Sequence, residues 1–532
     1  MDFPLTLNTI LSRAETIHGE RELATRLPDK SWRRYNYRAM AQRAKCLALA
    51  LGRLGVEPGD RVATLCWNHY RHFEAYFGVP AFGAVLHTLN LRLHADDLVH
   101  IVNEAEDKVL IVDESLLPLL AQFRGRVKLE HVIAISDDGK LPADMLDYET
   151  IIGKEDENEF TYPEIDENRA ASMCYTSGTI GKPKGVVYSH RAIATHTLGA
   201  ALTCSFEIWE SDCILPVVPM FHVNCWGLPY VAAMMGSKLV FPGTHTDAES
   251  LLDAYEQEQV TISAGVPTVW LAMLEKLDDD PKRYDLSALR KMFVGGAAVP
   301  PSTMQAFQER HNLTMVAAWG MTETTPIGTV SYLRPGQETD SSEEQFASRS
   351  RQGSPVPFVE IRARGDEGLV PWDGEAMGEL EVRGPWIASS YYERPETDDR
   401  FTEDGWFRTG DVVSIDARGA MKIEDRAKDL IKSGGEWISS VDLENKIMGH
   451  PAVAEAAVIA MSHAKWGERP LAAVVIRGDQ SVSSDELHEF LISQVAKWWI
   501  PDLFEFIDEI PKTGAGKFDK VALRKLFDDR QT

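Results

Sequence analysis

The feature that most constrains the fold is an alternation of helical segments and short apolar runs in the first part of the 532-residue chain. Residues Tyr37 to Leu54 have the periodicity of an amphipathic helix, and the β-rich run Arg61 to Cys66 follows them. Two more short apolar runs, Phe82 to His87 and Lys108 to Val112, also follow helical segments. Helices that cross over between short buried strands are typical of mostly parallel sheets. The sequence therefore predicts an α/β fold, with a large N-terminal region of mostly parallel sheets flanked by helices.

A change in character near residue 425 predicts a second, smaller domain. There the short β-like runs and glycines give way to the charge-rich segment Glu424 to Asp429. The residues beyond it hold two helical segments and two β-like runs, at Val441 to Met448, Ser484 to Trp498, Ala454 to Met461 and Leu471 to Ile476. We expect an N-terminal domain over residues 1–426 and a small mobile α+β C-terminal domain over residues 427–532, with a hinge near Lys428.

Three other segments have a composition that suggests their structure. The acidic stretch Glu155 to Asn168 and the polar stretch Pro335 to Ser350 are predicted to be surface loops, the second of them mobile. The segment Ile214 to Ser237 has no charged side chain, but it contains three prolines, a histidine and an asparagine. Those residues disfavour a membrane-spanning helix and favour strand, loop and helix around an apolar pocket.

The net charge of the chain limits the classes of molecule that its surface can bind. The chain has 55 Lys and Arg against 81 Asp and Glu, a net charge of −26, and 44% of its residues are hydrophobic. Such a field repels nucleic acid backbones and anionic lipid surfaces, so we expect no nucleic acid partner. A small anion such as ATP still binds wherever a few cations and backbone N–H groups converge.

The cysteines and the N-terminus indicate a compartment. The six cysteines show neither a Cys-x-x-Cys pair nor the Cys/His spacing of a zinc site, and they are interpreted as reduced packing residues. The N-terminus lacks a basic region followed by an apolar stretch, so no signal peptide is visible. A cytoplasmic location is predicted.

A further strand is predicted over Ala170 to Tyr175. The segment Tyr175 to Gly185 (YTSGTIGKPKG), directly after it, has the composition of a phosphate loop. Glycines let the backbone N–H groups approach oxyanions, hydroxyl side chains add donors, and Lys184 supplies a positive charge. The spacing is not that of a P-loop NTPase, because Lys182 is followed by Pro183. Taken alone, the segment could also be an ordinary Gly/Ser-rich turn.

Three later segments complete a candidate site. Trp319 to Glu323 (WGMTE) and Arg408 to Asp411 (RTGD) each place a carboxylate beside a glycine. One carboxylate suits a Mg²⁺ ion shared with phosphate oxygens, and the other suits the two ribose hydroxyls. Near the end of the chain, Pro511 to Lys517 (PKTGAGK) presents a lysine on a glycine-rich loop. Between a carboxylate and a phosphate, that lysine would stabilise the charge that develops as an acyl phosphate forms.

Taken in this order, these segments resemble the adenylate-forming superfamily of acyl-CoA synthetases, peptide-synthetase adenylation domains and luciferases. The similarity runs from Tyr175 to Lys517. It is strongest to the fatty acyl-CoA synthetase branch, which includes methylmercaptopropionate-CoA ligases, in the blocks Pro219 to Asn224, Gly265 to Trp270 and Ile431 to Ser440. The resemblance implies that a carboxylate and MgATP give acyl-AMP and pyrophosphate, after which CoA displaces AMP. It also implies the adenylate-forming fold and, by analogy, a homodimer.

The resemblance also implies roles for individual residues. Thr176 and Glu323 would hold Mg²⁺ and phosphate, Lys517 would bridge the carboxylate and the α-phosphate, and His222 would lie beside the acyl carbonyl. Domain rotation about Lys428 would withdraw Lys517 and bring the segment Ile431 to Glu436, with Lys432, into the thioester site. Trp226 would be a gate that opens the acyl tunnel after ATP binds, with Val223 in the same pocket. The remaining nucleotide contacts would come from the phosphate loop (Ser177, Gly178, Thr179, Gly181 and Lys184), the adenine side (Gly295, Gly296, Ala297, Trp319, Gly320, Met321 and Thr322) and the ribose side (Asp411 and Arg426).

One departure from the family pattern bears on the phosphate loop. The family usually has a second hydroxyl residue where this chain has Ile180. The acid itself is not readable from the sequence, so medium-chain, long-chain and small thioether acids stay open. Two other functions are a stand-alone adenylation module that loads a carrier protein in trans and a non-catalytic nucleotide-binding or fatty-acid-binding protein. The retention of Lys517 and Glu323 argues against the non-catalytic one.

Overall fold

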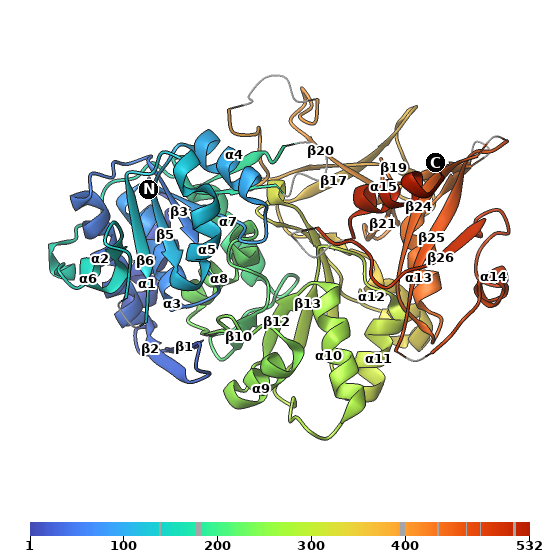
Figure 1. Ribbon diagram of the computed structural model, residues 1–532, viewed down its shortest axis with the longest axis horizontal. Helices are drawn as coiled ribbons and strands as arrows, with labels where there is room; N and C mark the ends of the chain where they lie inside the picture. Colours follow the sequence, from blue (N-terminus) through green and yellow to red (C-terminus); the bar gives the residue numbers. More distant parts are fainter. Residues whose placement is uncertain are drawn as a thin grey trace.

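The structure is a computed structural model that describes residues 1–137, 140–176, 182–393, 399–433, 436–463, 465–478, 480–513 and 518–531. The chain forms an elongated molecule, with the N-terminal elements at one end and the C-terminal elements at the other (Figure 1). Two large sheets make up the N-terminal region, a smaller antiparallel sheet follows them, and a further sheet carries the C-terminal elements.

The first large sheet carries the segment predicted to be a phosphate loop. In the described part of the chain it has seven strands, in the order β7-β6-β5-β3-β4-β8-β9, and only the edge pair β8–β9 is antiparallel. The strands are β3 (Arg61–Leu65), β4 (Val85–Thr88), β5 (Asp107–Asp113), β6 (His131–Ile135), β7 (Leu146–Asp147), β8 (Ala170–Tyr175) and β9 (Gly185–Ser189). The helices α2 (Tyr37–Arg53), α3 (Tyr70–Phe82), α4 (Ala95–Ala105), α5 (Leu117–Phe123) and α6 (Tyr148–Ile152) accompany it.

The second large sheet has nine strands in the described residues, in the order β16-β15-β14-β13-β12-β10-β11-β1-β2. The six strands from β14 to β1 are parallel, and the pairs at the two edges are antiparallel. The strands are β1 (Glu22–Arg26), β2 (Trp32–Asn36), β10 (Cys213–Pro216), β11 (Lys238–Phe241), β12 (Ile262–Gly265), β13 (Lys291–Val294), β14 (Met315–Gly320), β15 (Ile327–Val330) and β16 (Ser354–Pro355). The other helices of the N-terminal region are α1 (Leu7–Thr16), α7 (His190–Ala201), α8 (Leu228–Met235), α9 (Ala248–Glu258), α10 (Pro267–Asp279), α11 (Pro301–His311) and α12 (Ser342–Ser350).

Two smaller sheets complete the molecule. The antiparallel sheet has the order β18-β17-β19-β20-β21, from β17 (Glu360–Gly365), β18 (Gly368–Leu369), β19 (Met377–Arg383), β20 (Phe407–Ile415) and β21 (Met421–Arg426). The C-terminal sheet contains β22 (Ile431–Ser433), β23 (Glu436–Ile438), β24 (Val453–His463), β25 (Gly467–Ile476) and β26 (Leu503–Phe506), with α13 (Ser440–Met448), α14 (Ser484–Ile492) and α15 (Lys520–Gln531).

Separate cores underlie this arrangement. One cluster of buried apolar side chains includes Val109 of the seven-stranded sheet, Phe293 of the nine-stranded sheet and Val413 of the antiparallel sheet. The C-terminal sheet has its own cluster, which includes Ile431, Leu443 and Val474. Burial of apolar surface therefore joins the three N-terminal sheets, whereas the C-terminal elements pack mainly among themselves.

The sequence periodicity predicted the element types well. The helix expected over Tyr37 to Leu54 is α2, and the Asn36 side chain caps it by accepting from the Ala39 N–H. The four predicted strand runs of the first sheet are β3, β4, β5 and β8, each within a few residues of its expected bounds. In the C-terminal region α13, β24 and β25 confirm three of the four predicted elements.

Two predictions need correction. The stretch Pro335 to Ser350, predicted to be a loop, contains α12, because Ser341 and Glu344 form a capping box and Phe346 is buried against the rest of the protein. The helix predicted over Ser484 to Trp498 ends at Ile492, because Leu487 and Leu491 are its buried apolar side chains and the chain then turns to bury Ile500.

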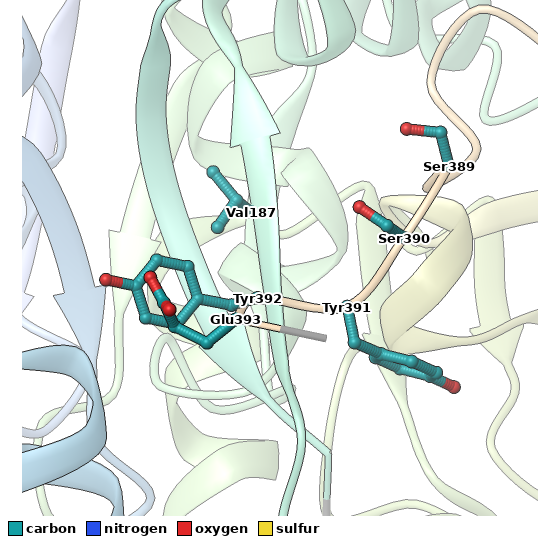
Figure 2. A pocket seen from close by; sticks show the side chains of 6 residues that line it. All are labelled: Val187, Ser389, Ser390, Tyr391, Tyr392 and Glu393. Carbon is teal, nitrogen blue, oxygen red and sulfur yellow. The ribbon is translucent and has the colours of Figure 1, made fainter. Parts of the chain in front are cut away.

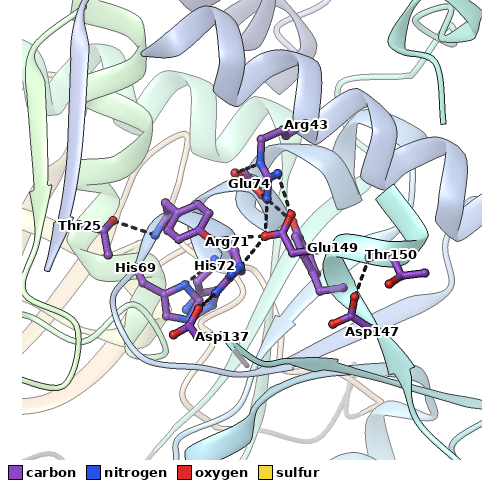
Figure 3. Close-up of polar contacts among 12 residues, drawn as sticks. Thr25, Arg43, His69, Arg71, His72, Glu74, Asp137, Asp147, Glu149 and Thr150 are labelled. Atoms are coloured by element: carbon purple, nitrogen blue, oxygen red, sulfur yellow. Dashed lines mark hydrogen bonds and ion pairs between the residues drawn. The ribbon is translucent and has the colours of Figure 1, made fainter. Parts of the chain in front are cut away.

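A partly buried ion network ties α6 to the neighbouring helices (Figure 3). The Arg43 guanidinium of α2 bonds both Glu74 of α3, at 2.6 Å, and Glu149 of α6, at 2.9 Å. Arg71 bonds Glu149 at 2.7 Å and Asp137 at 2.9 Å. Burial favours the protonated form of Glu149, but the hydrogen bonds and charges of Arg43 and Arg71 outweigh it and lower the pKa of this carboxyl to about 2.

The apolar segment Ile214 to Ser237 forms β10, a buried turn and the short helix α8, as expected. Among the described helices, none has the length and apolar character needed to cross a bilayer.

Candidate active site

The stem of the predicted phosphate loop is closed by two reciprocal hydrogen bonds. β8 and β9 pair antiparallel, so the residue after β8 and the residue before β9 meet at the end of the hairpin. The Thr176 N–H donates to the Lys184 carbonyl at 2.9 Å, and the Lys184 N–H donates to the Thr176 hydroxyl at 3.1 Å. The two bonds fix the Thr176 hydroxyl at the backbone of Lys184. Ser177, Gly178, Thr179, Ile180 and Gly181 lie outside the described residues.

Glu323 is connected to this stem through a tyrosine that the sequence analysis did not identify. Glu323 is only 3% exposed and lies in a short 3₁₀ turn, Thr322–Thr324, after β14. The Tyr391 hydroxyl donates to its Oε1 at 2.5 Å, and the Lys184 ammonium lies 4.5 Å from the centre of the Tyr391 ring. One aromatic side chain therefore contacts the predicted phosphate lysine on its face and the predicted metal carboxylate at its hydroxyl.

Tyr391 belongs to an irregular segment that borders a cavity of about 400 Å³. Val187 of β9 and the residues Ser389 to Glu393 line it (Figure 2). The side chains of Tyr391 and Tyr392 point to opposite sides of this segment in Figure 2. No sequence motif singles out Tyr391. The general need of a buried tyrosine hydroxyl for a partner is its only signal, and it does not reveal which partner.

The residues predicted to hold the nucleoside form a second cluster. Asp411 on β20 and Arg426 on β21 are direct cross-strand partners, and Arg426 Nε bonds Asp411 Oδ1 at 2.7 Å. The indole Nε1 of Trp319 donates to the other oxygen, Asp411 Oδ2, at 2.8 Å. Trp319 is 5% exposed and packs on Gly328, where a Cβ would come within 2.4 Å of the ring. The contact between Trp319 and adenine stays a prediction. The burial of the Trp319 ring also fits a packing role in the core.

The segment after His222 adopts a left-handed turn. Val223, Asn224, Cys225 and Trp226 have φ between 45° and 56°, and Gly227 has 75°. Left-handed backbone costs about 1–2 kcal/mol for each residue other than glycine, and a β-branched residue such as Val223 is particularly unfavourable there. Four such residues in succession, all buried, indicate strain that the surrounding packing holds in place.

This turn places Trp226 against the loop predicted to contact adenine. A Cβ at Gly295 would come within 3.0 Å of the Trp226 ring, so the glycine allows the ring to lie against the loop. Gly296 has φ +85°, a conformation that favours glycine, while Ala297 is exposed. Trp226 itself is 8% exposed.

The remaining predicted residues lie on the C-terminal side. Lys432 is an exposed residue of β22, and its backbone N–H donates to Glu468 at 2.8 Å. Lys428 follows β21, and burial, the largest effect, lowers the pKa of its ammonium. Lys517 lies outside the described residues. Contacts across the predicted hinge join β21 to α13, including Lys422 to Asp442 at 2.7 Å and the Ser440 N–H to Asp425 at 2.6 Å.

One other group of side chains has the composition of a metal site. Cys66, His69 and Asp113 bring a sulfur, a nitrogen and an oxygen within 4.8 Å of one another. His69 caps α3 with Nδ1 and bonds Asp113 at 2.8 Å with Nε2, and the Cys66 thiol bonds the Ile111 carbonyl. Burial raises the pKa of that thiol well above its usual value. These hydrogen bonds account for the cluster without a metal.

Comparisons with known proteins identify the family. Residues 13–392 match the family described as "AMP-binding enzyme", and residues 442–517 match "AMP-binding enzyme C-terminal domain". The long-chain-fatty-acid–CoA ligase of Thermus thermophilus is 47% identical over 99% of this chain and 96% of its own. The medium-chain-fatty-acid–CoA ligase of Ectopseudomonas oleovorans is 41% identical, over 99% of this chain and 96% of its own. The 3-methylmercaptopropionyl-CoA ligase of Ruegeria lacuscaerulensis is 40% identical, over 100% and 99%.

A solved structure agrees with these relatives. The anthranilate CoA ligase AuaEII in complex with anthranoyl-AMP is 27% identical and superposes with a TM-score of 0.87, over 99% of this chain and 98% of that chain. The predicted adenylate-forming fold is therefore confirmed. The chain belongs to the AMP-binding enzyme family and is one of its acyl-CoA ligases, acid–thiol enzymes that use ATP and CoA.

Proposed function

We propose that this acyl-CoA ligase activates a medium- or long-chain fatty acid in two steps. In the first, a carboxylate oxygen attacks the α-phosphorus of ATP and pyrophosphate leaves. In the second, the CoA sulfur attacks the acyl carbonyl, the thiol proton is lost and AMP leaves. The relatives from T. thermophilus and E. oleovorans support the choice of acid, because both cover nearly the whole chain at 41% identity or more.

The observation that carries the site assignment is the contact series from Lys184 through Tyr391 to Glu323. Lys184 would neutralise charge on the β- and γ-phosphates, while Tyr391 fixes the carboxylate of Glu323 toward the same region. We assign Asp411 and Arg426 to the ribose, and Trp319 with Gly295, Gly296, Ala297, Gly320, Met321 and Thr322 to the adenine side. The phosphate-loop residues Ser177, Gly178, Thr179 and Gly181 are assigned to the phosphates on the family pattern.

Thr176 and Glu323 supply oxygen donors of the type that Mg²⁺ prefers, so these residues fit the ion that the reaction needs. A bound Mg²⁺ would neutralise phosphate charge during the first step. His222 would orient the acyl carboxylate, and Val223 and Trp226 would line its entrance. The charge between carboxylate and α-phosphate is assigned to Lys517, and Lys432 is assigned to the thioester step.

The domain division fits this assignment. We propose domains over residues 1–426 and 427–532 that rotate about Lys428 between the two steps. The separate apolar cluster of the C-terminal sheet supports a body that moves as a unit. A homodimer and a cytoplasmic location are also proposed, the second supported by the free state of all six cysteines.

One alternative to this proposal has a different acid, and another has a different acceptor. The Ruegeria relative, at 40% identity, favours 3-methylmercaptopropionate as the second candidate substrate. A carrier protein in place of CoA is the alternative of another class.

The test is acyl-CoA formation, read by mass spectrometry, from acetate, butyrate, octanoate, dodecanoate, palmitate and 3-methylmercaptopropionate with MgATP and CoA. Highest turnover between octanoate and palmitate supports the proposal. Highest turnover with 3-methylmercaptopropionate would make this acid the substrate in place of a fatty acid. Formation of acyl-AMP without acyl-CoA would favour a carrier protein as the acceptor.

A further inference from the structure

Arg469 on β25 is a buried arginine that contacts two segments distant from it in the sequence. Its guanidinium bonds the Asp502 carboxylate through Nε at 3.0 Å and through Nη2 at 2.7 Å. Nη2 also donates to the Ile500 carbonyl at 2.9 Å. Nη1 donates to the Ser433 hydroxyl at 3.2 Å and to the Trp498 carbonyl. These bonds use all five N–H groups that an arginine side chain has.

One of the two segments is the hairpin that carries Lys432. The strands β22 and β23 pair antiparallel, and Ser433 ends β22 one residue after Lys432. Among the described residues, β22 and β25 pair at a single position, Ser433 with Gly467. Ile431 is buried in the apolar cluster of the C-terminal sheet, but Lys432 is exposed. A two-stranded hairpin has little stability of its own, so one backbone pairing leaves its orientation weakly fixed.

Two consecutive residues of β25 supply the missing constraint. Glu468 accepts from the Lys432 backbone N–H at 2.8 Å, and Arg469 donates to the Ser433 hydroxyl. Successive side chains of a strand point to opposite faces of the sheet, so these two hold β22 from both sides. Arg469 is 7% exposed and Ser433 is 6% exposed. Their bond is therefore shielded from water, which makes it the stronger of the two constraints.

The geometry requires an arginine at this position. A guanidinium is planar and presents its donors in fixed directions, whereas a lysine has three donors on a flexible stem. The Asp502 carboxylate neutralises the guanidinium charge and fixes its plane through two of its nitrogens. A lysine could still pair with Asp502, but it could not also bond Ser433 and the carbonyls beyond it.

We propose that Arg469 is a positioning residue for the thioester step. Through Ser433 it holds the β22–β23 hairpin in the orientation in which Lys432 meets acyl-AMP and CoA. The first step does not use this hairpin and does not depend on Arg469. This inference rests on the proposed function, because it adopts the assignment of Lys432 to the thioester step and of Lys517 to adenylation.

The test measures the two steps separately in two variants, Ser433→Ala and Arg469→Lys. Conversion of supplied dodecanoyl-AMP with saturating CoA reports the thioester step, and pyrophosphate release with dodecanoate and MgATP reports adenylation. Loss of a hydrogen bond to a charged group, or misplacement of a reacting group by about 1 Å, costs about 10- to 100-fold in rate. We expect thioester formation to slow by about 10-fold in Ser433→Ala and by about 10- to 100-fold in Arg469→Lys. Adenylation should keep the wild-type rate in both.

Three controls separate positioning from a loss of folding. Adenylation is the first, because Lys517 also belongs to the C-terminal part of the chain, so unfolding there would slow both steps. Arg477→Lys is the matched substitution, since Arg477 follows β25 at its other end and bonds the Val453 carbonyl at 3.2 Å. It should leave both rates unchanged. The double variant of Arg469→Lys and Ser433→Ala should be no slower than Arg469→Lys alone, because both changes remove the same bond.

The outcomes distinguish this inference from the proposed function. Thioester formation at the wild-type rate in folded Ser433→Ala and Arg469→Lys proteins overturns the inference alone. Equal slowing of both steps, or additive effects in the double variant, also overturns it. If Arg469→Lys does not fold, the rates of Ser433→Ala decide. A wild type that forms no acyl-CoA from any acid overturns the proposed function itself.

Discussion

Replacing Tyr391 by phenylalanine tests the bracing of Glu323. The change removes the hydroxyl that bonds Glu323 at 2.5 Å and keeps the ring over which the Lys184 ammonium lies at 4.5 Å. A hydrogen bond to a charged group contributes about 1.5–3 kcal/mol. If that energy serves to hold the carboxylate in place as pyrophosphate leaves, adenylation should slow by about 10- to 150-fold, since each 1.36 kcal/mol of barrier is a factor of ten.

The assay separates the two steps. Pyrophosphate release with dodecanoate and MgATP reports adenylation, and conversion of supplied dodecanoyl-AMP with CoA reports thioester formation. We expect Tyr391→Phe to slow only the first. Tyr392→Phe is the matched control, because Tyr392 is the next residue and points to the other side of the segment (Figure 2). Adenylation by Tyr391→Phe at the rate of the control would refute the bracing role.

Three other predictions follow from the site and from the ion network. Lys517→Ala should abolish adenylation and leave thioester formation from supplied acyl-AMP largely intact, and equal loss in both steps would contradict the role assigned to this lysine. Ile180→Thr should lower the MgATP concentration required or raise turnover, because a hydroxyl adds a phosphate donor; unchanged kinetics would mean that backbone N–H groups suffice. The pKa of Glu149 is depressed to about 2 by Arg43 and Arg71 against the opposing effect of burial, so the charged network stabilises the fold above the ordinary glutamate pKa of 4.5. The melting-temperature advantage of the wild type over Glu149→Gln should therefore be full at neutral pH and shrink as the pH falls through about 4.5 toward 2, whereas an advantage independent of pH would contradict the assignment.

The sequence predicted those parts of the fold that depend on local pattern. The helical periodicity of Tyr37 to Leu54 and the apolar run of Ala170 to Tyr175 correspond to α2 and β8, because apolar spacing decides which face of an element is buried. The helix α12 was missed, although Ser341 and Glu344 have the spacing of a capping box. A polar composition outweighed a specific local signal there.

The candidate site was predicted only where its residues stand in short motifs. Asp411 and Arg426 come from separate segments, yet their cross-strand pairing follows from a register that the sequence does not state. The contact between Tyr391 and Glu323 joins positions 68 residues apart and depends on tertiary packing. The left-handed turn is beyond local reasoning altogether, because the intrinsic preferences of Val223 and Cys225 oppose it and only their surroundings impose it.

The most direct test of the two-step ligase reaction is a single-turnover experiment with rapid quenching. The enzyme in excess is mixed with dodecanoate, limiting MgATP and CoA, and all products are quantified by mass spectrometry. We expect dodecanoyl-AMP to rise and then decay into dodecanoyl-CoA, with one AMP and one pyrophosphate released for each thioester formed. Release of ADP and phosphate would contradict the two-step reaction. Formation of dodecanoyl-CoA and AMP before any dodecanoyl-AMP has appeared would also contradict it.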